Sequence, residues 1–177
     1  MKLITICASG PSLIKQDCDL VGHTECPVIA VNSSWKLNPE CQFIYAGDLR
    51  WWQKNISHVP KTAELWSSDK TATSRYGVKN FPTDTSCTFN SGQRAILFAQ
   101  WLGAENIILL GYDCSIANGS HWHGDHPELD NPTPANIKRW KGEFERTAQA
   151  LSGKTRVINC SRETALTCFP GWACRSH

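Results

Sequence analysis

The sequence has no long run of like charges and no long apolar run. No stretch of Lys or Arg is longer than two residues, and the formal net charge of the 177-residue chain is +2. The concentrated positive charge of a nucleic-acid-binding protein is therefore missing. The N-terminus lacks the apolar core of a signal peptide, and no apolar stretch approaches the length of a membrane span. We therefore expect a cytoplasmic protein with no membrane partner and no strong nucleic-acid footprint.

The sequence also lacks the Cys-x-x-Cys pairs that are typical of zinc sites and redox centres. Its nine cysteines are an odd number, and we expect no secretory leader before them. Both a disulfide framework and a structural zinc site are therefore disfavoured, and we expect buried free thiols. With 41% apolar residues, the chain is large enough for one domain with a substantial core, which we expect to cover residues 1–177.

Apolar stretches of strand length recur along the chain, and each ends in small or polar residues. They cover residues 3–7, 28–31, 43–46, 107–110 and 157–158. Because these stretches are continuous rather than alternating, they predict strands that are buried on both faces. Such strands are typical of a parallel sheet covered by helices.

Two segments have the pattern of helices. One follows Asn90-Ser91-Gly92 and ends at Gly103, and the other covers about residues 134–151. Residues 50–90 have a weaker pattern, and we expect irregular loops there with at most one short strand near residues 63–66. The alternation of strands and helices predicts an α/β fold, a single Rossmann-like three-layer sandwich with a mostly parallel sheet.

Small and polar residues follow three of the expected strands. In a parallel sheet the carboxyl ends of the strands meet at one edge, where α/β proteins bind their ligands. The helix that begins near residue 91 adds free N–H groups and the positive end of a helix dipole, which favour an anion. The candidate nucleotide- and phosphate-binding residues are Ser9, Gly10, Pro11, Ser12, Asn32, Ser91, Gly92, Tyr112 and Asp113. Ser12 also suits the alternative role of capping a short helix.

Three of the six histidines fall within one six-residue segment, His-Trp-His-Gly-Asp-His. The segment matches a signature of metallo-β-lactamase-type hydrolases, in which His121, His123, Asp125 and His126 would bind paired metal ions that activate water. Those enzymes need further histidines downstream, and only His177 follows. A structural loop is a second interpretation. We favour general acid–base catalysis by His126 or His123, with Asp125 orienting the imidazole.

The motifs occur in a characteristic order. Gly-Pro-Ser-Leu follows the first strand, Asn follows the second, Ser-Gly opens a helix, and Leu-Gly-x-x-x-Ile-x-Leu-x-Gly-x-Asp covers the fourth strand; a His loop, a helix and a Cys-bearing last strand come after it. This order resembles the small bacterial sialyltransferases that use CMP-sialic acid. It is also similar to phage proteins and to archaeal hydroxymethylpterin pyrophosphokinase-like proteins with the Gly-Pro-Ser turn. If a phage encodes the chain, the expected location is the host cytoplasm.

The resemblance to the sialyltransferases implies roles for single residues. The first turn (residues 9–12) and Asn32 would contact the nucleotide and its phosphate, Ser91 and Gly92 would bind the nucleotide, and His126 would be the general base. The first turn departs from the family, because it reads Ala-Ser-Gly where the sialyltransferases have Gly-Asn-Gly.

We therefore expect a glycosyltransferase-like enzyme that transfers a sugar from a nucleotide-activated donor to a hydroxyl acceptor, with no metal ion and no other cofactor. A nucleoside monophosphate leaving group makes metal-free transfer chemically reasonable. Three alternatives stay open: a pterin-type diphosphotransferase that uses Asp48 or Asp113 through Mg²⁺, a protein that sequesters a nucleotide without turnover, and the metal-dependent hydrolase. The chain is also compatible with a homo-oligomer.

Overall fold

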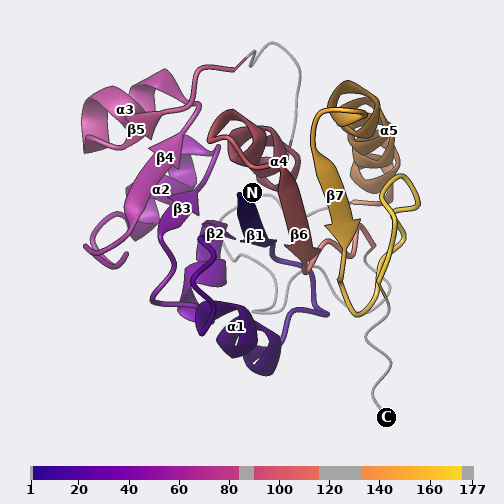
Figure 1. Cartoon of the computed structure of the whole chain (residues 1–177). Helices are drawn as coiled ribbons and strands as arrows, with labels where there is room; N and C mark the ends of the chain where they lie inside the picture. The colour runs from indigo at the N-terminus through magenta and orange to yellow at the C-terminus, as the bar shows by residue number, and fades with distance from the viewer. Residues whose placement is uncertain (1, 84–89, 116–132, 173–177) are drawn as a thin grey trace.

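The fold is built on one seven-stranded parallel sheet (Figure 1), seen in a computed structural model that describes residues 2–83, 90–115 and 133–172. The strands are β1 (Leu3–Cys7), β2 (Val28–Val31), β3 (Phe43–Tyr45), β4 (Glu64–Ser67), β5 (Lys79–Asn80), β6 (Asn106–Leu110) and β7 (Arg156–Asn159). Their order is β5-β4-β3-β2-β1-β6-β7, and every adjacent pair is parallel. The Rossmann-like α/β fold expected from the sequence is confirmed.

Helices cover both faces of the sheet, so the fold has three layers (Figure 1). The helices are α1 (Lys15–Gly22), the 3₁₀ helix η1 (Asn32–Lys36), α2 (Leu49–Asn55), α3 (Lys70–Tyr76), α4 (Ser91–Trp101) and α5 (Pro134–Leu151). Buried side chains of α1, α2 and α3 share one core with the sheet, and those of α4 and α5 share the other. The bounds of α5 agree with the helix expected at residues 134–151.

Strand β2 shows why the apolar stretches of the sequence are continuous. Ile29 and Val31 are buried in the core beneath α4 and α5, whereas Val28 and Ala30 are buried in the core beneath α1, α2 and α3. Successive side chains of a strand point to opposite faces. Because both faces are covered, every position of β2 needs an apolar residue.

The prediction of irregular loops over residues 50–90 is wrong, although the short strand expected near residues 63–66 is present as β4. The segment holds most of α2, all of α3, and strands β4 and β5. Trp51 and Trp52 are buried on α2, with ring centroids 4.9 Å apart and ring planes at 88°. Asp48 and Asp69 cap the N-termini of α2 and α3. Both helices have only seven residues, and fewer than two full turns give too short a pattern to recognise.

The seven cysteines within the described ranges are free thiols. Cys7, Cys18 and Cys41 are buried, as expected, and the other four are half-buried. Burial raises the pKa of Cys41 to about 12, so this thiol stays protonated at neutral pH. In the part of the chain that the structure describes, no helix is both long and apolar enough to span a bilayer.

Candidate functional site

A cavity of about 520 Å³ lies at the carboxyl ends of the strands. The strand order reverses between β1 and β6, which is the position where open α/β sheets bind ligands. Its wall is formed by residues that follow β1, β2, β3, β4 and β6, by the start of α4 and by one side of α5. The lining residues are Ala8, Ser9, Gly10, Val31, Asn32, Gly47, Asp48, Leu49, Trp51, Asp69, Asn90, Ser91, Gly92, Arg94, Gly111, Tyr112, Asp113, Cys114, Ser115, Ile137, Trp140, Phe144 and Leu166. Most of the residues expected at a nucleotide site therefore meet here.

The turn after β1 approaches the end of β6 so closely that it needs glycine. Gly10 donates its backbone N–H to the carbonyl of Gly111 at 2.8 Å. A Cβ atom at Gly10 would lie 2.5 Å from that carbonyl oxygen and would also overlap Asp113. Gly111 itself has φ of 72°, a left-handed conformation that favours glycine. The two glycines bring two cavity-lining segments side by side.

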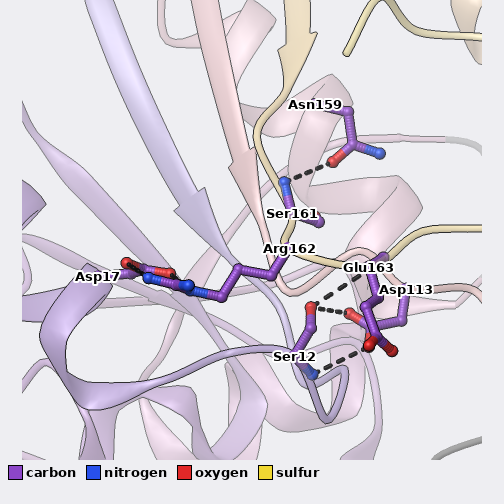
Figure 2. Close-up of polar contacts among 7 residues, drawn as sticks. All are labelled: Ser12, Asp17, Asp113, Asn159, Ser161, Arg162 and Glu163. Atoms are coloured by element: carbon purple, nitrogen blue, oxygen red, sulfur yellow. Dashed lines mark hydrogen bonds and ion pairs between the residues drawn. The ribbon is translucent and has the colours of Figure 1, made fainter. Parts of the chain in front are cut away.

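Ser12 and Asp113 hold this turn through a pair of hydrogen bonds (Figure 2). Ser12 donates its backbone N–H to Asp113 Oδ2 at 2.9 Å and its hydroxyl to Asp113 Oδ1 at 2.6 Å. Ser12 and Pro11 do not line the cavity, unlike Ser9 and Gly10. The hydroxyl expected to face a phosphate is therefore directed at a carboxylate, and it does not cap α1, whose N-cap residue is Ile14.

Asp113 is buried, with 5% of its surface exposed. Burial raises the pKa of Asp113, and the two hydrogen bonds from Ser12 oppose that rise. Because both carboxylate oxygens accept hydrogen bonds from Ser12, Asp113 holds the turn after β1 in position at the edge of the cavity. A Mg²⁺ ion bound by Asp113 would have to share these oxygens with the Ser12 hydrogen bonds.

Two side-chain oxygen atoms of the cavity wall are buried and have no hydrogen-bond partner among the described residues. They are Ser9 Oγ and Asn32 Oδ1. Asn32 also has φ of 52°, a left-handed conformation that is uncommon for a residue other than glycine and that occurs at binding sites. A buried polar atom without a partner is costly, so a donor group on a ligand would stabilise either atom.

The start of α4 faces the same cavity. Asn90 caps the helix by accepting the backbone N–H of Gln93 at 2.7 Å, and Ser91 and Gly92 form the first turn. The Tyr112 hydroxyl donates to the carbonyl of Gly92 at 2.8 Å. Burial raises the pKa of Tyr112 well above its usual value, so the hydroxyl stays protonated as a donor. Tyr112 thus connects the end of β6 to the start of α4.

Arg94 is a cavity residue that the sequence analysis missed. It is the one charged residue of α4, and only 9% of its surface is exposed. A Cβ atom at Gly47 would lie 3.2 Å from Arg94 Nη1 and 3.3 Å from Ser91 Oγ, which accepts the backbone N–H of Gly47 at 3.0 Å. Burial raises the pKa of Tyr45, and Arg94 is one of the neighbours that oppose this rise. The sequence did contain a signal for this residue, because Arg94 is a single cation inside a helix that is otherwise uncharged.

Two helix-capping carboxylates also line the cavity. Asp48 accepts the backbone N–H of Arg50 at 2.8 Å, and Asp69 accepts that of Ala72 at 2.8 Å. Only Asp48 was identified in the sequence. Since each carboxylate has two oxygens, each keeps acceptor capacity beyond its capping bond.

The candidate catalytic residues His123, Asp125 and His126 lie outside the described residues, as does His121. Within the described ranges, no three His, Cys, Asp or Glu side chains gather as a possible metal site. The proposed base and the competing metal site therefore both remain predictions.

The fold is similar to that of two glycosyltransferases of known structure. The MAf glycosyltransferase from Magnetospirillum magneticum AMB-1 matches with a TM-score of 0.68 and 14% identity over 99% of this chain, which corresponds to 34% of that chain. The sialyltransferase CST-II, solved with a trisaccharide acceptor and CMP, matches with a TM-score of 0.62 and 16% identity, over 97% of this chain and 86% of that one. No protein-family model and no curated protein sequence matches. The likeness confirms the resemblance at the level of the fold.

Proposed function

We propose that the cavity binds a nucleotide-activated sugar and that the protein transfers the sugar to a hydroxyl group of an acceptor. The observation that carries this proposal is the buried Arg94 at the first turn of α4, facing a glycine at the carboxyl edge of a parallel sheet. A guanidinium and a helix N-terminus together suit a phosphate. The resemblance to glycosyltransferase folds supports the same class of ligand.

The donor that fits best is a sugar carried by a cytidine monophosphate, as in CMP-sialic acid. Such a donor brings one phosphate and one sugar carboxylate, and Arg94 supplies a permanent positive charge at the cavity wall. Ser9 Oγ and Asn32 Oδ1 would then accept hydrogen bonds from N–H or O–H groups of the donor. CST-II, whose structure holds CMP, supports this choice.

In the proposed reaction the acceptor hydroxyl oxygen forms a bond to the anomeric carbon of the sugar. The bond between that carbon and the phosphate oxygen breaks, and the nucleoside monophosphate leaves with the electron pair. His126, or His123 in its place, takes the proton of the acceptor hydroxyl. Arg94 and the N–H groups of Ser91 and Gly92 stabilise the charge that develops on the leaving phosphate, so the proposal requires no metal ion.

Calorimetric titration of the purified protein with CMP tests the donor site. We expect Arg94→Gln to weaken CMP binding about tenfold or more, because a hydrogen bond to a charged group contributes about 1.5–3 kcal/mol. Arg139→Gln is the matched control, since Arg139 is exposed on α5 and does not line the cavity. Unchanged CMP affinity in folded Arg94→Gln protein would exclude this phosphate site. Release of free CMP from CMP-sialic acid with an acceptor distinguishes transfer from sequestration.

A further inference from the structure

The segment of residues 159–165, which begins with the last residue of β7, runs across the end of β6 and is here called the strap (Figure 2). It bonds to the backbone of two cavity residues. Tyr112 donates its N–H to Ser161 Oγ at 2.9 Å, and its carbonyl accepts the Thr164 hydroxyl at 2.7 Å. The carbonyl of Asp113 accepts the N–H of Ala165 at 2.8 Å. The strap thus fixes the backbone of Tyr112 and Asp113.

Asn159 gives the strap its shape. Its Oδ1 accepts the N–H of Ser161 at 3.1 Å, and its Nδ2 donates to Thr164 Oγ1 at 3.1 Å. With 2% of its surface exposed, the Asn159 side chain is shielded from competing water. One buried amide therefore holds both hydroxyl-bearing residues that bond to Tyr112.

A second contact anchors the strap to the rest of the molecule. Arg162 bonds to the carboxylate of Asp17 on α1 through Nε at 2.7 Å and Nη2 at 3.0 Å (Figure 2). Two parallel bonds of this kind fix the orientation of the guanidinium group relative to the carboxylate as well as the distance between them. Neither residue lines the cavity.

Tyr112 and Asp113 each reach one ligand-facing segment. The Tyr112 side chain bonds to Gly92 at the start of α4, and the Asp113 side chain bonds to Ser12 in the turn after β1. A chain of hydrogen bonds therefore runs from the strap to both segments that would surround a phosphate. Ser161 and Thr164 make no contact with the cavity themselves.

We propose that Ser161 and Thr164 are positioning residues, which set the spacing between the start of α4 and the turn after β1 by fixing Tyr112 and Asp113. The consequence for ligand binding rests on the proposed donor site. The expected change in the start of α4 and in the turn after β1 does not rest on that site, because it occurs in the protein without ligand. The proposal can therefore be tested separately from the function.

Thr164→Val removes the hydroxyl at nearly constant volume, and Thr155→Val is the matched control. The Thr155 hydroxyl also bonds to a backbone carbonyl, that of Ala104 at 3.3 Å, but Thr155 does not line the cavity. Thr164→Val removes three hydrogen bonds of the Thr164 hydroxyl, which are those with the Tyr112 carbonyl, Asn159 Nδ2 and the Leu166 N–H. We expect amide hydrogen exchange in the two segments, at Gly10, Ser12, Gln93 and Arg94, to become about three- to tenfold faster or more, because each lost hydrogen bond is worth about that factor. Thr155→Val should leave these segments unchanged.

Titration with CMP completes the test. We expect Thr164→Val to weaken CMP binding about three- to tenfold and Thr164→Ser, which keeps the hydroxyl, to restore it. If wild-type protein binds no CMP, the proposed donor site is wrong, and the exchange data still decide the role of the strap. Unchanged exchange at both segments in folded Thr164→Val, or equal changes in Thr155→Val, would overturn the positioning role. If Thr164→Val does not fold, Ser161→Ala takes its place under the same criteria.

Discussion

Asp113 combines burial, a raised pKa and two hydrogen bonds from Ser12. In the unfolded chain its carboxyl ionises around the ordinary pKa of 3.8, whereas the folded protein holds the proton to higher pH. The unfolded state therefore binds fewer protons in the interval between the two values, and the free energy of unfolding falls there as pH rises. Above the folded pKa this contribution becomes constant.

Asp113→Asn removes the titrating carboxyl group, and it should therefore remove this contribution to the pH dependence of the free energy of unfolding. Denaturant unfolding of the wild type and the variant, measured from below pH 3.8 to neutrality, gives the comparison. We expect the stability of the wild type relative to the variant to decrease with pH, because other titrating groups cancel in the difference. A relative stability that increases with pH would mean that the Ser12 bonds outweigh burial and lower the pKa of Asp113.

His126 is the preferred general base. We expect His126→Ala to lower turnover about a hundredfold or more while donor affinity changes little, since a base acts on the acceptor proton and not on the bound donor. His123→Ala should have a milder effect, because only one imidazole can occupy the position beside the acceptor hydroxyl. Steady-state kinetics with a confirmed donor and acceptor measure both variants. Full turnover in both would make the His loop structural.

Single residues show where inference from the sequence ends. A parallel topology explains why Ser9, Asn32 and Gly92 face one cavity, because the ends of parallel strands meet at one edge. The topology does not determine that Ser12 turns toward Asp113, since this pairing joins residues 101 positions apart and depends on side-chain orientation. The role of Arg94 was missed because a lone cation in a helix is usually exposed.

At the scale of elements, a helix could be predicted from the sequence only when its pattern of apolar and capping residues was long enough. The α5 segment has 18 residues and both of its ends were signalled, by Pro134 at the start and Gly153 past the end. Helices α2 and α3 were missed because their seven residues derive their stability from packing. Trp51 and Trp52, with their paired rings in the core, supply that packing for α2.

The start of α4 is the element on which phosphate binding depends most. A Cβ atom at Gly92 would lie 3.3 Å from both Asn90 Oδ1 and Tyr112 Cε1, tighter than most such contacts. Gly92→Val should therefore displace the first turn and weaken CMP binding about tenfold or more, while the protein stays folded. Gly142→Val on α5 is the control, because its Cβ would meet no atom within 4 Å. If calorimetric titration gives equal CMP affinities for the two folded variants, the start of α4 does not bind the phosphate.

At the scale of the whole molecule, the cavity joins segments that follow five strands of one sheet. A ligand that bridges them should stabilise the entire fold by mass action. At a concentration one hundred times its dissociation constant, CMP should contribute about 2.7 kcal/mol to the free energy of unfolding. For a chain of this size, that corresponds to a rise in melting temperature of about 5–10 °C.

The same melting experiment, together with elemental analysis, separates metal-free donor binding from the two metal-dependent alternatives. The proposed donor site uses Arg94 and helix N–H groups, so the rise with CMP should survive a chelator, and elemental analysis should find less than one metal ion per chain. A rise that disappears with chelator and returns with Mg²⁺ would favour the diphosphotransferase, with Asp48 as a ligand. Stoichiometric zinc, iron or manganese would favour the hydrolase, because the loop of His121, His123, Asp125 and His126 is the one segment of the sequence with a matching ligand pattern.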